Sequence, residues 1–442
     1  MKLNSNIIKA QYAVRGKLAQ MATKLKNEGK SIISCNIGNP QALQQKPISF
    51  VRQLLAATEY PYNFNNNIPA DIYKRSKTLR EDIGSTGAYS DSLGHPIIKK
   101  SVSKFIAKRD NVKAPSIDSI VLTNGASAGI QMILSLIKTD DTKIMIPVPQ
   151  YPLYSATLDC LAIPSIEYYL KHHSWTLDLN EIEKSFKDLN PTAIVVINPG
   201  NPTGTVMNYQ EINDLLFLCQ KYNVGVLADE VYQENILSGT PFVSFRKVCM
   251  ENNYNVPLFS FHSTSKGIIG ECGKRGGWLD TLNIDNNFHQ NLVKYQSIQL
   301  CSNIVGQITV EAMVNPPSEG DESYQHYIEE TTTLHNSMKE RSDLMYQYLS
   351  SIHHLEKPKG SMYMFPSIPM SQKFIDKCKK ENVLPDEAYC MEILNKTGMC
   401  WVPGSGFSMK DHHFYRTTFL PPIETLEEIM PKIINAHNKI IN

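Results

Sequence analysis

Short apolar runs alternate with helical patterns from about residue 95 onward, and this alternation restricts the chain to few folds. The runs are rich in Val and Ile, are bounded by Pro, Gly or Asn, and lie at 119–125, 143–149, 193–200, 224–230 and 258–265. Such runs are typical of strands buried on both faces of a parallel sheet. Helical patterns lie between several of them, at 96–110, 129–138 and 209–222. The alternation therefore predicts a doubly wound α/β domain with a mostly parallel sheet.

The C-terminal third has a different pattern. A polar break at 315–323 precedes a long helical stretch at about 324–350, and the runs GSMYMFPS, WVPGSGF and FYRTTFL then suit a small antiparallel sheet. At 442 residues the chain also exceeds the size of a single hydrophobic core. We predict a large domain over 95–323, a connecting helix and smaller α+β domain over 324–442, and an N-terminal segment, 1–94, that joins the smaller domain.

Composition excludes several classes of protein. Lys and Arg total 44 and Asp and Glu total 43, and this balance gives no electrostatic basis for binding nucleic acid or an anionic membrane. No run is long and apolar enough to cross a bilayer. Nine cysteines without a CxxC pair favour reduced thiols over a disulfide framework or a zinc site, so we expect no metal.

Polar residues collect where the predicted strands end. The five tails read TNGAS, PQYPLY, NPGNPTG, ADEVY and HSTSK. Ligands of open α/β sheets bind in the crevice beyond the carboxyl ends of the strands. The tails together therefore predict one ligand site at this edge of the sheet.

The tails TNGAS and HSTSK, together with Arg275 further along the chain, suit a phosphate-bearing ligand that forms a Schiff base. TNGAS leads into a helix whose first N–H groups can bind phosphate, although an ordinary N-cap by Ser127 explains the same residues. Arg275 offers a guanidinium fork and Ser263 a hydroxyl for the phosphate oxygens. Lys266, among small and hydroxyl residues, can form a Schiff base, although SxxK alone is a weak signal.

The remaining tails suit an aromatic ring. Asp229 follows an apolar run, and a protonated pyridine nitrogen would balance its buried charge; a helix cap is the alternative. NPGNPTG taken alone is only a loop sequence, but its Asn201 amide can donate to a ring hydroxyl oxygen and also contact a substrate carboxylate. Tyr232 can reach the same ring hydroxyl. Tyr151 can stack on the ring or serve in packing.

Arg416 lies within the apparent strand FYRTTFL, where its charge needs a partner. A substrate carboxylate would supply two parallel hydrogen bonds, and an internal ion pair with Asp or Glu is the alternative. A Schiff-base lysine, a phosphate cradle, a pyridinium partner and a carboxylate fork together indicate pyridoxal 5′-phosphate chemistry on an amino acid.

These motifs resemble those of the class I and II aminotransferases of fold-type I over nearly the whole chain. ADEVY and NPGNPTG are widespread in that family, whereas YAVRG at 12–16 and STSKGIIGECGKRGG at 263–277 are most similar to its alanine aminotransferase branch. Further matching motifs are NIGNPQ, GAYSDSLG, LTNGAS, QYPLYSA, LADEVYQEN, PGSGF and YRTTFLPP. The resemblance implies that the large domain carries pyridoxal phosphate and that residues 1–94 also contribute dimer contacts.

The resemblance also implies roles for individual residues. Lys266 would hold the cofactor as a Schiff base and move the proton at the substrate Cα, with Asp229 and Tyr232 completing the catalytic set. The other expected cofactor ligands are Ala126, Ser127, Tyr151, Asn201, Ser263 and Arg275. Arg416, Asn201 and the backbone of Gly38 would hold the substrate carboxylate. Tyr89 would reach the phosphate bound by a second subunit, which makes a homodimer necessary.

The expected reaction is the exchange of alanine and 2-oxoglutarate for pyruvate and glutamate. Another transaminase, or a lyase of the C–S or aminocyclopropane-carboxylate type, would use the same fold. A non-catalytic regulator is disfavoured by the balanced charge, and a Rossmann dehydrogenase by the absence of GxGxxG after a first strand. The basic N-terminus, with no acid before Glu28, has some features of a mitochondrial presequence. Because the family pattern begins by about residue 10, we expect a cytoplasmic enzyme.

Overall fold

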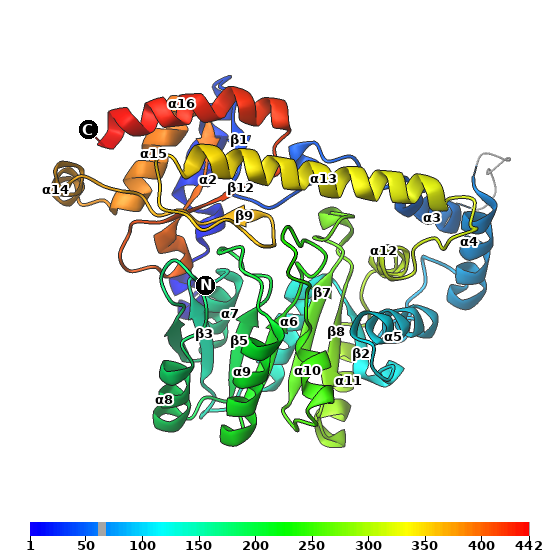
Figure 1. The fold of residues 1–442 in the computed structure, drawn as a ribbon. Coiled ribbons are helices and arrows are strands. Elements are labelled where there is room, and N and C mark those ends of the chain that lie inside the picture. The colour runs from blue at the N-terminus through cyan, green and yellow to red at the C-terminus, as the bar shows by residue number, and fades with distance from the viewer. Residues whose placement is uncertain (61–67, 442) are drawn as a thin grey trace.

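A seven-stranded sheet forms the centre of the larger part of the molecule (Figure 1). The computed structural model describes residues 1–60 and 68–441. The strands follow the order β2-β8-β7-β6-β5-β3-β4, and β8 alone runs antiparallel to its neighbours in this sheet. Their bounds are β2 Ile120–Thr123, β3 Ile144–Val148, β4 Ser165–Tyr169, β5 Ala193–Ile197, β6 Gly225–Asp229, β7 Leu258–Ser263 and β8 Gly277–Leu282.

All five predicted runs are strands of this sheet, but β4 and β8 were not predicted. Strand β4 lies at the sheet edge, and its sequence SIEYY is mostly partly exposed, so it lacks the apolar signal of a central strand. Strand β8 carries Asp280, whose buried carboxylate accepts from Arg246 at 2.7 Å. Because this partner comes from a distant helix, the sequence of β8 alone does not resemble a buried strand.

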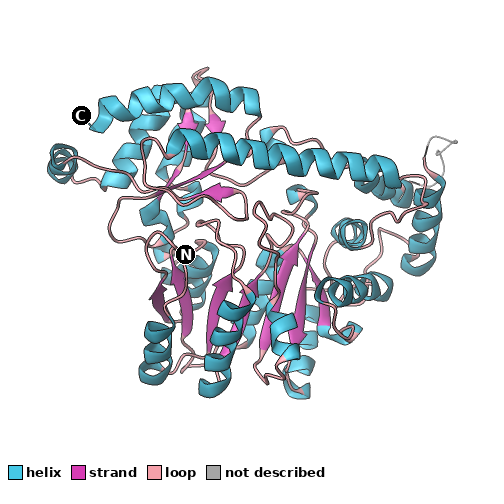
Figure 2. Cartoon of the chain, in the orientation of Figure 1, coloured by secondary structure: helices cyan, strands magenta, loops and turns pink. Residues whose placement is uncertain are grey.

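Helices cover both faces of the large sheet (Figure 2). Side chains of β5 alternate between the two faces: Ala193 and Val195 join one core cluster, and Ile194 and Val196 join another. The helices of this part are α5 Pro96–Asp110, α6 Ala126–Leu136, α7 Leu153–Leu161, α8 Leu179–Leu189, α9 Tyr209–Tyr222, α10 Phe245–Glu251, α11 Asn286–Ile298 and α12 Ile304–Val314.

Local signals explain why two helix predictions were accurate and a third was not. Helix α5 starts with a proline at its first turn, and α9 starts with a capping box formed by Asn208 and Glu211. Helix α6 begins three residues earlier than the predicted 129–138, at Ala126. Its cap is Gly125, which has no side chain to signal a helix start.

A second, smaller part lies above the large sheet in Figure 1. It holds the antiparallel sheet β11-β12-β9, as predicted, and β1 paired with β10. The strands are β1 Ile33–Ser34, β9 Tyr363–Met364, β10 Met399–Cys400, β11 Val402–Pro403 and β12 Tyr415–Thr418. Its helices are α2 Lys17–Asn27, α14 Gln372–Glu381, α15 Pro385–Thr397 and α16 Ile423–Ile441. The N-terminal segment thus supplies β1 beside β10, far along the chain.

Helix α13, Tyr324–Leu349, runs above the large sheet from the small part toward α3 and α4 (Figure 1). The remaining helices are α1 Ser5–Lys9, α3 Ser49–Glu59 and α4 Ala70–Ile83, with 3-10 turns η1 Ala13–Arg15, η2 Gln41–Leu43, η4 Ile117–Ser119, η5 Cys272–Lys274 and η6 Gly404–Phe407. The division of the chain at residues 94 and 323 stays a prediction.

Among the described residues, no helix could span a membrane and no acidic, His or Cys side chains gather as a metal site.

Candidate active site

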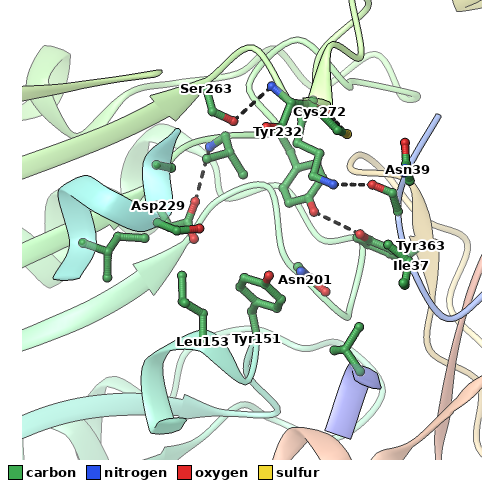
Figure 3. Close-up of a pocket in the computed structure, with 18 of the residues that line it drawn as sticks. Ile37, Asn39, Tyr151, Leu153, Asn201, Asp229, Tyr232, Ser263, Cys272 and Tyr363 are labelled. Atoms are coloured by element: carbon green, nitrogen blue, oxygen red, sulfur yellow. Dashed lines mark hydrogen bonds between the residues drawn. The ribbon is translucent and has the colours of Figure 1, made fainter. Parts of the chain in front are cut away.

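A cavity of about 460 Å³ lies where the carboxyl ends of the central strands face the small sheet. Eleven of the predicted site residues line it; Tyr89, exposed to 77%, does not. The eleven are Gly38, Ala126, Ser127, Tyr151, Asn201, Asp229, Tyr232, Ser263, Lys266, Arg275 and Arg416. In Figure 3, Asp229 lies across the cavity from Ile37, Asn39 and Tyr363, with Tyr151 and Leu153 on a third side.

One end of the cavity has the chemistry of an anion site. Ala126 and Ser127 form the first turn of α6, and its cap Gly125 contributes no side-chain hydrogen bond. The alternative that Ser127 caps this helix is therefore wrong. Arg275 donates to the Asn124 carbonyl at 3.1 Å, and a Cβ on Gly125 would lie 2.4 Å from its guanidinium. The absence of a side chain at Gly125, whose φ is +76°, thus lets a cation lie against a helix N-terminus.

Asp229 is a buried carboxylate at the end of β6. The Tyr154 hydroxyl donates to it at 3.0 Å and the Val231 N–H at 3.4 Å. Burial raises the pKa of Asp229 to about 6. The two hydrogen bonds and the charge of Lys266 act in the opposite direction and only partly offset the effect of burial. No helix begins at Asp229, so the alternative of a helix cap is wrong. The carboxylate faces the cavity, and no cation of the described chain forms an ion pair with it.

Lys266 and two tyrosines, Tyr232 and Tyr363, also line the cavity. The Lys266 ammonium donates to the Gly38 carbonyl and lies 5.9 Å from the Tyr232 ring centroid. Tyr232 donates its hydroxyl to that of Tyr363 at 3.2 Å (Figure 3). Burial raises the pKa of Tyr363, but the charges of Lys266 and Arg416 outweigh it and hold that pKa below its ordinary value.

Arg416, on β12, is the most deeply buried cation of the site, with 1% exposure. Its guanidinium donates to the Asn201 side-chain oxygen at 2.9 Å and to the Asn36 carbonyl at 2.5 Å, and lies 4.1 Å from the Tyr363 ring centroid. Its Nε has no hydrogen-bond partner. Within residues 1–60 and 68–441 it forms no ion pair, so the alternative of an internal salt bridge is wrong. The cavity thus contains a buried cation that has no anionic partner in the described chain.

Several lining residues were not predicted individually. Tyr12 and Arg15 come from the motif YAVRG, which was noted for its resemblance but given no role. The Tyr12 hydroxyl lies 2.8 Å from that of Tyr151. Tyr363 lies in GSMYMFPS, which was interpreted only as a strand, and Asn39 is in NIGNPQ beside the predicted Gly38. Proximity to a recognised motif was the available signal for Tyr12, Arg15 and Asn39, whereas Tyr363 had none.

The chain matches one protein family over most of its length. The sequence pattern of the family "Aminotransferase class I and II" matches residues 53–433. The chain belongs to the class I and II aminotransferases. One relative is the mitochondrial alanine aminotransferase of Saccharomyces cerevisiae, which is 41% identical over 95% of this chain and 77% of its own length. Another is glutamate–glyoxylate aminotransferase 2 of Arabidopsis thaliana, which is 40% identical over 99% of this chain and 94% of its own length. The solved alanine aminotransferase of Pyrococcus furiosus, 23% identical, superposes with a TM-score of 0.82 over 99% of this chain and 100% of its own. The predicted fold class is therefore confirmed as fold-type I.

Pyridoxal phosphate is the cofactor of this aminotransferase family, and the cavity has the chemistry to hold it. The turn at Ala126 and Ser127 beside Arg275 suits the phosphate. The buried Asp229 carboxylate suits a protonated ring nitrogen. Lys266, partly buried, supplies an amine within the same cavity.

Proposed function

We propose that this aminotransferase converts L-alanine and 2-oxoglutarate to pyruvate and L-glutamate, with the two substrates bound in turn at one site. The observation that carries the proposal is Arg416, a buried guanidinium without an ion pair that shares its cavity with Lys266 and Asp229. A cation buried in this way is costly unless a ligand brings the opposite charge. The 41% identity to a relative named alanine aminotransferase supports the choice of amino acid.

Arg416 would bind and orient the α-carboxylate. Its hydrogen bonds to Asn36 and Asn201 fix the guanidinium, and its Nε is free to donate to a bound oxygen. Asn201 and the backbone of Gly38 would complete this carboxylate site. A carboxylate held there would direct the substrate's Cα toward Lys266, which donates to the same Gly38.

Lys266 would bind the cofactor covalently and then carry the proton at Cα. Bound pyridoxal phosphate withdraws electron density from that carbon. Asp229 would keep the ring nitrogen protonated, while Asn201 and Tyr232 would hold the ring hydroxyl. Tyr151 would stack on the ring, its hydroxyl held by Tyr12.

The phosphate would be held at the first turn of α6. Ala126 and Ser127 would donate backbone N–H groups, and Ser263 and Arg275 would add a hydroxyl and a charge. Tyr89 of a second subunit would complete this site in a homodimer. The cytoplasmic location expected from the N-terminal sequence stays a prediction, and the yeast relative is named mitochondrial.

A second candidate reaction is the transfer of the amino group from glutamate to glyoxylate. It is supported by the 40% identity to a relative named for that reaction, close to the 41% of the alanine enzyme. A lyase on the same fold would differ from both, because it would release ammonia without an acceptor.

The visible absorbance of the purified holoenzyme tests the proposal. Adding L-alanine alone should convert a yellow protein to a colourless form and release one pyruvate per site, and 2-oxoglutarate should restore the colour. A yellow protein that glutamate bleaches and alanine does not would instead favour the glyoxylate reaction. Ammonia release without an acceptor would contradict both transaminase assignments.

A further inference from the structure

Arg15 is a cation of the active-site cavity that the proposed mechanism does not use. It ends the turn η1, Ala13–Arg15, in the motif YAVRG, and lines the cavity together with Tyr12 and Val14. Its side chain is exposed and, within residues 1–60 and 68–441, makes no hydrogen bond or ion pair. An arginine available in a substrate cavity can accept a planar, bidentate anion.

The charges of the cavity leave Arg15 without an assigned partner. Its cations are Arg15, Lys266, Arg275 and Arg416, and Asp229 is the acid among the lining residues. Arg275 lies at the helix N-terminus that suits a phosphate, Lys266 carries the amine chemistry, and Arg416 takes the first carboxylate. One guanidinium then remains for a second negative group of the substrate.

The turn that carries Arg15 is anchored to the same residue as Arg416. The Asn36 amide donates to the Val14 carbonyl at 3.1 Å, while the Asn36 carbonyl accepts from Arg416 at 2.5 Å. On its other side, the turn is held by the hydrogen bond between Tyr12 and Tyr151 at 2.8 Å. Hydrogen bonds to one asparagine thus hold both the turn that carries Arg15 and the guanidinium of Arg416. Recognition of two carboxylates on one molecule requires two cations held at a defined separation.

We propose that Arg15 is the specificity-determining residue for the distal carboxylate of the five-carbon dicarboxylate substrates, glutamate and 2-oxoglutarate. This inference rests on the proposed function and deepens it. Alanine and pyruvate carry one carboxylate, which Arg416 binds, and their methyl group leaves Arg15 in water. Because Arg15 is exposed rather than buried, its charge stays solvated when no second carboxylate is present. The same cavity therefore accepts both a monocarboxylate and a dicarboxylate.

Binding of unreactive acids to the holoenzyme tests the proposal without turnover. Isothermal titration with glutarate, a dicarboxylate, and butyrate, a monocarboxylate, should show that Arg15→Gln raises the Kd of glutarate roughly 10- to 100-fold, the loss expected for a charge-assisted pair. The Kd of butyrate should change less than about 2-fold. Arg15→Lys should recover part of the glutarate affinity, because a lysine keeps the charge without the fork. Lys17→Gln, the matched control, removes an exposed charge two residues away and outside the cavity, and both constants should stay unchanged.

Kinetics give the second readout. Arg15→Gln should lower kcat/KM for 2-oxoglutarate by the same 10- to 100-fold and leave that for L-alanine within about 3-fold. Equal weakening of glutarate and butyrate, or weakening of neither, would overturn the proposal. If the wild-type enzyme does not process alanine, the proposed function fails, yet the difference between glutarate and butyrate still decides the role of Arg15.

Discussion

The Arg416 guanidinium donates to the side-chain oxygen of Asn201 at 2.9 Å, and the two residues are 215 positions apart in the sequence. Arg416 lies on β12 of the small sheet, and Asn201 follows β5 of the large one. Neither residue has a carboxylate partner in the described chain. The proposed carboxylate site is therefore built across the contact between the two sheets.

Arg416→Lys should lower kcat/KM for L-alanine about 10²- to 10³-fold, because a lysine cannot keep both the Asn201 bond and two bonds to a carboxylate. Thermal stability should fall little, since the buried charge has no ion pair to lose. Arg246→Lys is the matched control: that arginine is also buried but is paired with Asp280 at 2.7 Å, outside the cavity. Its Tm should fall by several degrees with kcat/KM nearly unchanged. The opposite pattern in the two variants would contradict the assignment of Arg416.

Asp229→Asn should stabilise the cofactor-free protein at high pH. Burial raises the pKa of Asp229 to about 6 from 3.8, so the folded state holds its proton more tightly than the unfolded state does. Stability from this group is therefore present below about pH 4 and lost as pH rises through about 6. The unfolding free energy of the variant minus that of the wild type, measured by urea denaturation, should rise by about 1–2 kcal/mol from pH 5 to pH 8. The same difference at both pH values would show that Asp229 does not titrate there.

Gly38→Ala should disrupt the tyrosine pair of the site. A Cβ at this position would lie 2.0 Å from the Tyr363 hydroxyl oxygen, so this hydroxyl, which accepts from Tyr232, must shift. We expect at least a 10-fold loss of kcat/KM and a stability cost of about 1–3 kcal/mol. Gly239→Ala provides the control, because its Cβ would meet no atom within 4 Å. Wild-type kinetics in Gly38→Ala would show that Tyr363 can relocate without consequence.

Tyr89 provides a test of the proposed homodimer. It is 77% exposed and absent from the cavity of its own chain, so Tyr89→Phe should weaken cofactor binding only through a second subunit. Dimers that pair a Tyr89→Phe chain with a Lys266→Ala chain should regain activity. One of their two sites then has the intact lysine of the first chain and the intact tyrosine of the second. Reconstituted mixtures can be assayed against each variant alone. Mixtures no more active than the Tyr89→Phe enzyme would rule out a shared site.

Local signals were sufficient for much of the fold. The apolar runs predicted β2, β3, β5, β6 and β7, because strands buried on both faces must be apolar along their whole length. Proline and a capping box likewise fixed the starts of α5 and α9. The edge strand β4 and the Asp280-bearing β8 lacked such signals, since one is half exposed and the other depends on a distant arginine.

The sequence by itself determined which residues could take part in the chemistry, because hydroxyl, carboxylate and lysine side chains stand at strand ends that a parallel sheet brings to one edge. Only the tertiary structure decided their partners. It showed that Arg416 pairs with Asn201 instead of an acid, and that Arg15 faces the same cavity. The physical reason is distance along the chain: a cap or strand is fixed by neighbouring residues, whereas these contacts join positions that meet only after the two sheets pack together.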